Sequence, residues 1–152
     1  MLGILGGDER CPIARGLDVL GEKWTLMVVR DALLGSTRFS QFQASLGIPR
    51  EILTARLASL VESGVLERSS YKPDGGRARE EYRLTESGRD LGPVLLALGG
   101  WADRHHPSER RSDLRFVDAE TDEAVEAAVV AAGSGRIVPR DRVAARLDRP
   151  VS

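Results

Sequence analysis

The sequence is poor in cysteine, in lysine and in aromatic residues, and it has no long apolar run. Its 152 residues include one cysteine, Cys11, which excludes an intrachain disulfide framework and a cysteine-based zinc cluster. No apolar stretch approaches the roughly 20 residues that a membrane-spanning helix requires, and the first residues do not have the pattern of a signal peptide. We therefore expect a soluble, cytoplasmic protein that has no membrane partner.

The sequence also lacks an excess of either charge. Its 22 basic and 23 acidic residues give a formal net charge of −1, which argues against a protein that coats nucleic acid through bulk positive charge. The charges are unevenly placed, however, because residues 38–83 hold 8 basic and 6 acidic residues. Any basic surface must therefore be local.

Apolar residues recur with a helical period over most of the first hundred positions. The pattern predicts two helices in residues 12–34 separated at Gly21, a short helix over 40–46 capped by Ser40, a helix over 49–63 opened by Pro49, and a helix over 86–106 weakened at Gly99 and Gly100. The period changes to two over 65–71 and 81–85, which we predict to be strands on either side of the turn Pro73-Asp74-Gly75-Gly76. This order is typical of a helix-turn-helix followed by a β-hairpin wing.

Residues 11–106 resemble the HxlR family of bacterial transcription regulators, which are related to the MarR group. The matching motifs are the Cys-Pro pair at 11–12, Gly-x-Lys-Trp-Thr at 21–25, Arg38-Phe39, Leu-Thr-x-Arg-Leu-x-x-Leu at 53–60 and Tyr-x-Leu-Thr-x-x-Gly at 82–88. The resemblance implies a mainly α-helical winged helix-turn-helix that binds a pseudo-palindromic operator in double-stranded DNA as a homodimer. It also implies a regulator, more often a repressor, that a small-molecule effector can release.

The resemblance further implies that the N-terminal and post-wing helices form the dimer interface. The apolar residues that we expect there are Ile13, Leu17, Leu95, Leu98 and Trp101. Trp101 is alternatively part of an effector pocket between subunits.

The predicted recognition helix is the one that follows Pro49. Burial of Leu53, Leu57 and Leu60 turns Arg50, Glu51 and Thr54 outward at its N-terminal end, the part of a recognition helix that reaches base edges. Arg50 has the geometry to bind guanine through two hydrogen bonds, and Thr54 can hydrogen-bond a base or pack on a thymine methyl. Arg56 lies nearer the buried face, so it either clamps a phosphate or braces the fold.

Further DNA contacts are predicted in the wing and before the short helix. Lys72, Arg77 and Arg79 suit the minor groove and phosphates, although the same residues also fit an ordinary solvated turn. Arg38 and Ser40 are placed to bind phosphate.

Cys11 is a candidate sensor of oxidants or electrophiles, by resemblance to thiol-sensing members of the family. A helix N-terminus favours the thiolate and so its reactivity. The alternative is a small buried apolar residue.

We find no catalytic constellation, no metal site and no cofactor motif, so we do not expect an enzyme. The adjacent His105 and His106 lack the spacing of helical metal ligands and are expected to end their helix.

Two domains are expected, residues 1–106 for DNA binding and dimerisation and residues 107–152 as a small β-containing extension. In the extension we predict a hairpin near Leu114 and Phe116, strands or a helix within 125–132, a strand at 136–138 and a short helix from Pro139 to Leu147. A winged-helix module that binds a ligand or a protein, without DNA, is the alternative function.

Overall fold

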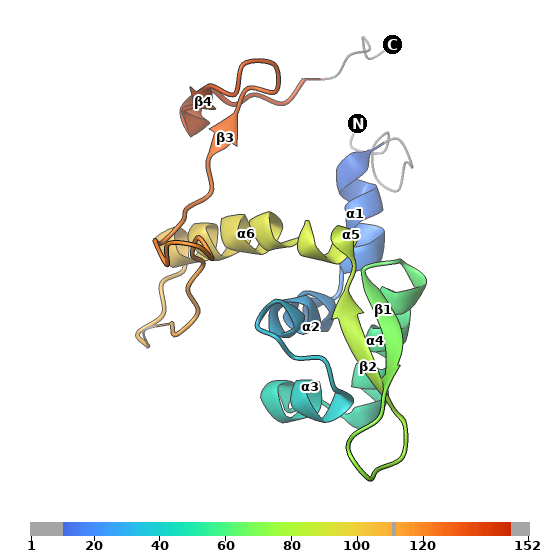
Figure 1. Cartoon of the computed structure of the whole chain (residues 1–152). Coiled ribbons are helices and arrows are strands. Elements are labelled where there is room, and N and C mark those ends of the chain that lie inside the picture. Colours follow the sequence, from blue (N-terminus) through green and yellow to red (C-terminus); the bar gives the residue numbers. More distant parts are fainter. Residues whose placement is uncertain (1–10, 111, 147–152) are drawn as a thin grey trace. The chain divides into compact units, whose positions relative to one another are not determined.

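The computed structural model describes residues 11–110 and 112–146, and it divides into two compact units between Leu95 and Leu96. The division falls inside a helix, whereas the predicted domain boundary follows residue 106. The first unit holds most of the helices and a β-hairpin, and the second holds the C-terminal extension (Figure 1). We describe each unit by itself.

The first two helices are separated at Gly21, as predicted. Helix α1 spans Pro12–Leu20 and α2 spans Lys23–Leu33. Cys11 is the N-cap of α1, and Pro12 occupies the first helical position, where a missing N–H costs no hydrogen bond. The backbone N–H of Gly21 donates to the Leu17 carbonyl and closes the last turn of α1.

The predicted start of the third helix is wrong by one residue. Helix α3 spans Phe39–Leu46, so Ser40 lies in its first turn and does not cap it. The cap comes from Gln41, whose Oε1 accepts hydrogen bonds from the backbone N–H groups of Thr37 and Arg38, both at 2.9 Å. Gln41 is the third residue of the helix, and a side chain at this position that binds the N–H of the N-cap residue is one half of a capping box. Gly47 ends the helix in the left-handed conformation, as expected.

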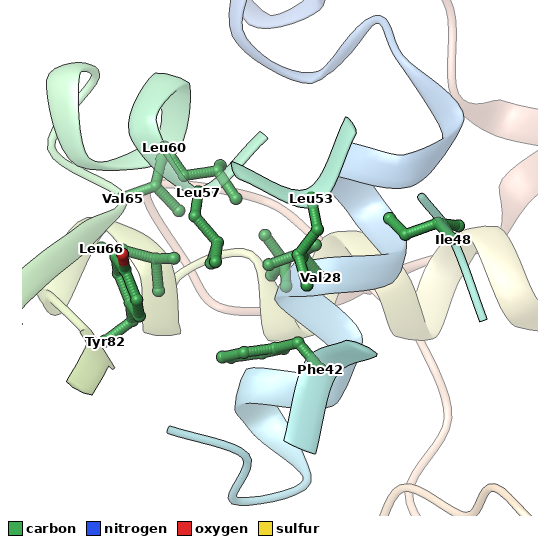
Figure 2. Close-up of a cluster of buried hydrophobic side chains, with 10 residues drawn as sticks. Val28, Phe42, Ile48, Leu53, Leu57, Leu60, Val65, Leu66 and Tyr82 are labelled. Carbon is green, nitrogen blue, oxygen red and sulfur yellow. The ribbon is translucent and has the colours of Figure 1, made fainter. Parts of the chain in front are cut away.

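Helix α4, Arg50–Glu62, supplies the centre of the core. Pro49 is its N-cap, so the helix begins one residue after the predicted start. Leu53, Leu57 and Leu60 are fully buried, which confirms the face predicted from their spacing. They pack among Val28 and Val29 of α2, Phe42 of α3, and the further buried residues Ile48, Val65, Leu66 and Tyr82 (Figure 2). Burial of each leucine contributes about 1.5–3 kcal/mol relative to exposure.

The hairpin pairs β1, Leu66–Tyr71, with β2, Arg79–Leu84. The strands are antiparallel, with Leu66 opposite Leu84 and Tyr71 opposite Arg79. The second strand begins two residues earlier than predicted. The backbone N–H of Tyr82 donates to the Thr37 carbonyl at 2.7 Å, which ties β2 to the segment before α3. The loop of the hairpin and α3 accordingly lie at the same end of the unit (Figure 1).

The single helix predicted over 86–106 is wrong. The chain forms α5, Glu86–Arg89, and α6, Gly92–His105, with turn residues between them. Pro93 explains the break, because it has no N–H to donate to the Arg89 carbonyl four residues earlier. Gly99 and Gly100, the predicted weak point, lie inside α6.

The extension has less regular structure than predicted. Its elements are a bridge between Val117 and Ala124, the antiparallel pair β3 (Val129–Val130) and β4 (Ile137–Val138), and the 3₁₀ turn η1 (Arg140–Arg142). The proposed helix within 125–132 and most of the proposed strand there are wrong. The helix predicted from Pro139 is one short turn, and Leu147 lies outside the described residues. None of residues 107–110 and 112–146 is buried, so the extension has no core that would enforce longer elements.

The fold is thus mainly helical, with a hairpin wing and a small β-containing extension. No helix among residues 11–110 and 112–146 is long and apolar enough to cross a membrane.

The packing around α5 gives a stability prediction. A Cβ on Gly88 would meet the backbone oxygen of Val65 and the Leu84 side chain well inside van der Waals contact, whereas a Cβ on Gly16, within α1, would meet nothing. Gly88→Ala should therefore lower the free energy of unfolding by about 1–3 kcal/mol. The matched control Gly16→Ala should raise it by about 0.5–1 kcal/mol through helix propensity. Urea unfolding measures both, and equal shifts for the two variants would contradict the packing.

Candidate nucleic-acid interface

The N-terminal end of α4 presents polar side chains to solvent. Pro49, Arg50, Glu51 and Thr54 are all exposed there, while Leu53 points into the core. This is the orientation that the leucine spacing predicts. The helix therefore offers a face on which an arginine and a threonine lie one turn apart.

Arg50 does not extend freely into solvent. Its guanidinium carbon lies 4.6 Å from the ring centroid of Phe39, the first residue of α3. The Thr54 hydroxyl donates to the Arg50 carbonyl oxygen at 2.8 Å, so its proton is already engaged. Side-chain contacts thus organise the first turn of α4.

A second arginine also lies over an aromatic ring. The guanidinium carbon of Arg38 lies 4.5 Å from the ring centroid of Tyr71, the last residue of β1. Arg38 is exposed just before α3, and Ser40 is exposed in the first turn of that helix. This contact joins the start of α3 to the end of β1, where the loop of the hairpin begins.

Lys72, Arg77 and Arg79 are exposed in and beside the hairpin loop. Within the part of the chain that the structure describes, none of them forms an ion pair, and neither do Arg38 and Arg50. Other arginines of the first unit do have carboxylate partners: Arg30 pairs with Asp31, Arg68 with Glu80 and Arg83 with Glu81. The cations predicted to contact DNA are therefore mostly those whose charge no acidic side chain offsets.

Arg56 differs from the other predicted contacts. Its Nη1 lies 3.5 Å from Glu22 Oε2, and only 24% of its side chain is exposed. Glu22 is the N-cap of α2, so the pair braces α4 against the start of α2. The geometry favours the bracing role over the phosphate clamp.

Glu81 is a residue that the sequence did not single out. It faces Ser69 across the hairpin and accepts hydrogen bonds from Ser69 Oγ at 3.2 Å and from Arg83 Nε at 3.0 Å. The hydrogen bond from Arg83 lowers the pKa of the Glu81 carboxyl below its usual value, as do the charge of Arg83 and hydrogen bonds from Ser69 and Thr37, against an opposing effect of burial. The carboxylate thereby holds both strands of the wing and the segment before α3.

Sequence reasoning missed Glu81 because two consecutive residues of β2, Glu81 and Tyr82, are nearly buried. In a regular strand, successive side chains point to opposite faces of the sheet, so one of these two residues would be exposed. The available signal was Arg83, two positions on, which projects from the same side of the strand.

The residues predicted for a dimer interface fall into two groups. Ile13 and Leu17 on α1 are 71% and 60% exposed, and Leu98 and Trp101 on α6 are about half exposed. Leu95, in contrast, packs partly against the core of its own unit. Four of the five apolar residues are therefore uncovered in the single chain.

Cys11 and the two histidines lie at helix ends. Cys11 is half-buried and its side chain makes no capping hydrogen bond. His105 is the last residue of α6, and the rings of His105 and His106 lie 5.8 and 5.0 Å from the Trp101 ring. The described residues contain no group of three potential metal ligands.

The amino-acid sequence is similar to those of a known family of proteins. The profile of the HxlR-like helix-turn-helix family matches residues 19–110. The HTH-type transcriptional regulator Rv3095 of Mycobacterium tuberculosis is 38% identical over 128 residues, which cover 76% of this chain and 80% of that protein. YdeP of Bacillus subtilis, of the same type, is 35% identical over 64% of this chain and 75% of its own length.

Solved structures agree with the fold. PA1607, a candidate transcription factor, is 37% identical and superposes with a TM-score of 0.78 over 93% of this chain and 98% of its own. The redox regulator HypR in its oxidised form is 32% identical, with a TM-score of 0.56 over 63% of this chain and 98% of its own.

The lowered pKa of Glu81 predicts how stability depends on pH. Its stabilising contribution should be fully present above the unfolded-state pKa near 4.5 and should be lost as the pH falls through the lower folded-state value. Glu81→Gln should therefore be less stable than wild type at neutral pH, and the difference should shrink in acid. Urea unfolding at several pH values measures it. A difference that stays constant down to pH 3 would contradict this role.

Proposed function

The chain belongs to the HxlR-like helix-turn-helix family, and we propose that it represses transcription by binding a pseudo-palindromic operator as a homodimer. The observation that carries the proposal is the set of exposed cations without acidic partners at the start of α4, before α3 and in the wing. The family and the named relatives are regulators of transcription. We infer that the chain acts by binding alone, in the cytoplasm, without a catalytic step.

The two DNA-contacting elements have different chemical roles. Arg50, at the start of α4, has in-plane N–H donors that match the O6 and N7 acceptors of guanine in the major groove. The wing cations Lys72, Arg77 and Arg79 act as charges near phosphates and the minor groove, where contacts depend little on sequence. Arg38 and Ser40 add phosphate contacts beside α3.

A homodimer accounts for the uncovered apolar residues. Ile13 and Leu17 on α1, and Leu98 and Trp101 on α6, are large apolar side chains that a single chain leaves in water. A second copy would cover them, and a two-fold axis would give each half-site of the operator the same recognition helix. We propose steric occlusion of a promoter by this dimer.

Release from DNA is proposed to come from a small-molecule effector or from modification of Cys11. Either would act by a difference in affinity between the DNA-competent and incompetent states. Cys11 is half-buried beside the start of α1, a helix of the proposed dimer interface. The similarity to HypR, a redox regulator, supports this route.

The DNA-binding surface is tested with fragments selected by the purified protein from a random-sequence pool. Arg50→Ala should weaken binding to the selected operator about tenfold or more and relax its sequence preference. Arg77→Ala should weaken binding to all sequences and reduce the slope of log K against log salt by about two, one phosphate contact from each protomer. Gel shifts at several salt concentrations measure both effects.

Arg115→Ala is the matched control, because Arg115 lies in the extension and pairs with Asp122 at 3.5 Å. It should leave both affinity and slope unchanged. Light scattering of the complex should give two protomers for each operator fragment. A wild-type protein that prefers no fragment would favour a ligand- or protein-binding module instead, and unchanged binding by both arginine variants would refute the proposed surface.

The role of Cys11 is tested by treating wild type and Cys11→Ser with a quinone, to which a thiolate adds with formation of a C–S bond. We expect wild type to lose operator affinity and the variant to keep it, since the chain has no other cysteine. Mass spectrometry of the intact protein confirms the adduct. Equal responses of the two proteins would exclude Cys11 as the sensor and leave the small-molecule route.

A further inference from the structure

We propose that Phe39 is a positioning residue that fixes the guanidinium of Arg50 for base reading and so contributes to operator specificity. This inference rests on the proposed function, since it assigns a role within the same DNA-binding surface. The juxtaposition is between the first residue of α3 and the first residue of α4, with the guanidinium carbon 4.6 Å from the ring centroid.

The phenyl ring is a fixed support. Phe39 is half-buried and packs against the buried core that includes Phe42 and Leu53. Its backbone position is set by the Gln41 cap, which holds the N–H groups of Thr37 and Arg38. Arg50 itself is exposed and forms no ion pair in the described chain. Within residues 11–110 and 112–146, the Phe39 ring is thus the group that lies against its charge.

The proposed role requires the planar face of the guanidinium to lie against the ring. The five N–H donors of a guanidinium lie in its plane, so in that arrangement its in-plane edge stays open. An arginine held this way keeps the donor geometry for O6 and N7 of guanine and loses less side-chain entropy when it binds. An unsupported arginine at the same position would lose that entropy on forming the complex.

A similar contact between an arginine and an aromatic ring links the residue before Phe39 to the wing. Arg38 precedes Phe39 in the chain, and its guanidinium lies over the ring of Tyr71 at the end of β1. Arg50 of the recognition helix and Tyr71 of the wing therefore both contact the Arg38-Phe39 pair. The start of α3 connects the two elements that we propose to contact DNA.

A double-mutant cycle tests the proposal. Phe39→Leu should weaken binding to the selected operator about two- to fivefold, which corresponds to the usual strength of an exposed cation–π contact. The same substitution in an Arg50→Gln background should have no effect. Binding to a non-specific fragment of equal length, which depends on phosphates, should be unchanged by Phe39→Leu. Phe39→Tyr, which keeps the ring, should restore wild-type operator affinity.

Two readouts separate this role from a general loss of structure and from failure of the proposed function. The midpoint of thermal unfolding is recorded for each variant, and the NMR shift of the Arg50 side-chain Nε–H, measured without DNA, should change in Phe39→Leu as the ring current is removed. An equal loss in both Arg50 backgrounds, a tighter complex with Phe39→Leu, or an unchanged Nε–H shift would overturn the proposal. Absence of any preferred fragment for wild type would overturn the proposed function itself, whatever the NMR result.

Discussion

The burial of three leucines along one side of α4 is the constraint on which the rest of the structure depends. Leu53, Leu57 and Leu60 occupy the centre of the core, and they fix the rotation of the helix about its own axis. A helix with this face buried has no freedom to turn, so its N-terminal end must present Arg50 and Thr54 to solvent. The same apolar packing that stabilises the fold therefore decides which polar side chains face a ligand.

A second set of contacts is polar; it holds the two strands of the wing together and ties the wing to the segment before α3. The Tyr82 N–H donates to the Thr37 carbonyl, and the Glu81 carboxylate accepts from Ser69 on the opposite strand and from Arg83. A two-stranded hairpin is only marginally stable by itself in water. Its position here thus depends on a few directional bonds and on the burial of Leu66 and Tyr82, so the wing is the element most sensitive to single polar substitutions.

The sequence predicted the fold class and the exposed positions well, because those follow from periodicity and from glycine and proline chemistry. The leucine spacing of α4 and the stop at Gly47 are local signals, and both were confirmed. Two errors were local. The prediction of one helix over 86–106 overlooked the missing N–H of Pro93, and the side chain that caps α3 is Gln41 and not Ser40. The partners of Arg56 and Arg50 lie on other elements, so only the packed fold identifies Glu22 and Phe39 as their contacts.

The bond from the Thr54 hydroxyl to the Arg50 carbonyl limits what this threonine can recognise. A hydroxyl group has one proton, and in this structure Thr54 donates it to the Arg50 carbonyl, with 2.8 Å between the two oxygens. Toward solvent, Thr54 therefore offers an oxygen lone pair and a methyl group. The base edges that suit this pair are the amino groups of adenine and cytosine and the methyl group of thymine, whereas the acceptor-only edge of guanine does not. In the proposed complex with DNA, one intrahelical hydrogen bond thus biases Thr54 against guanine, the base that we propose Arg50 to read.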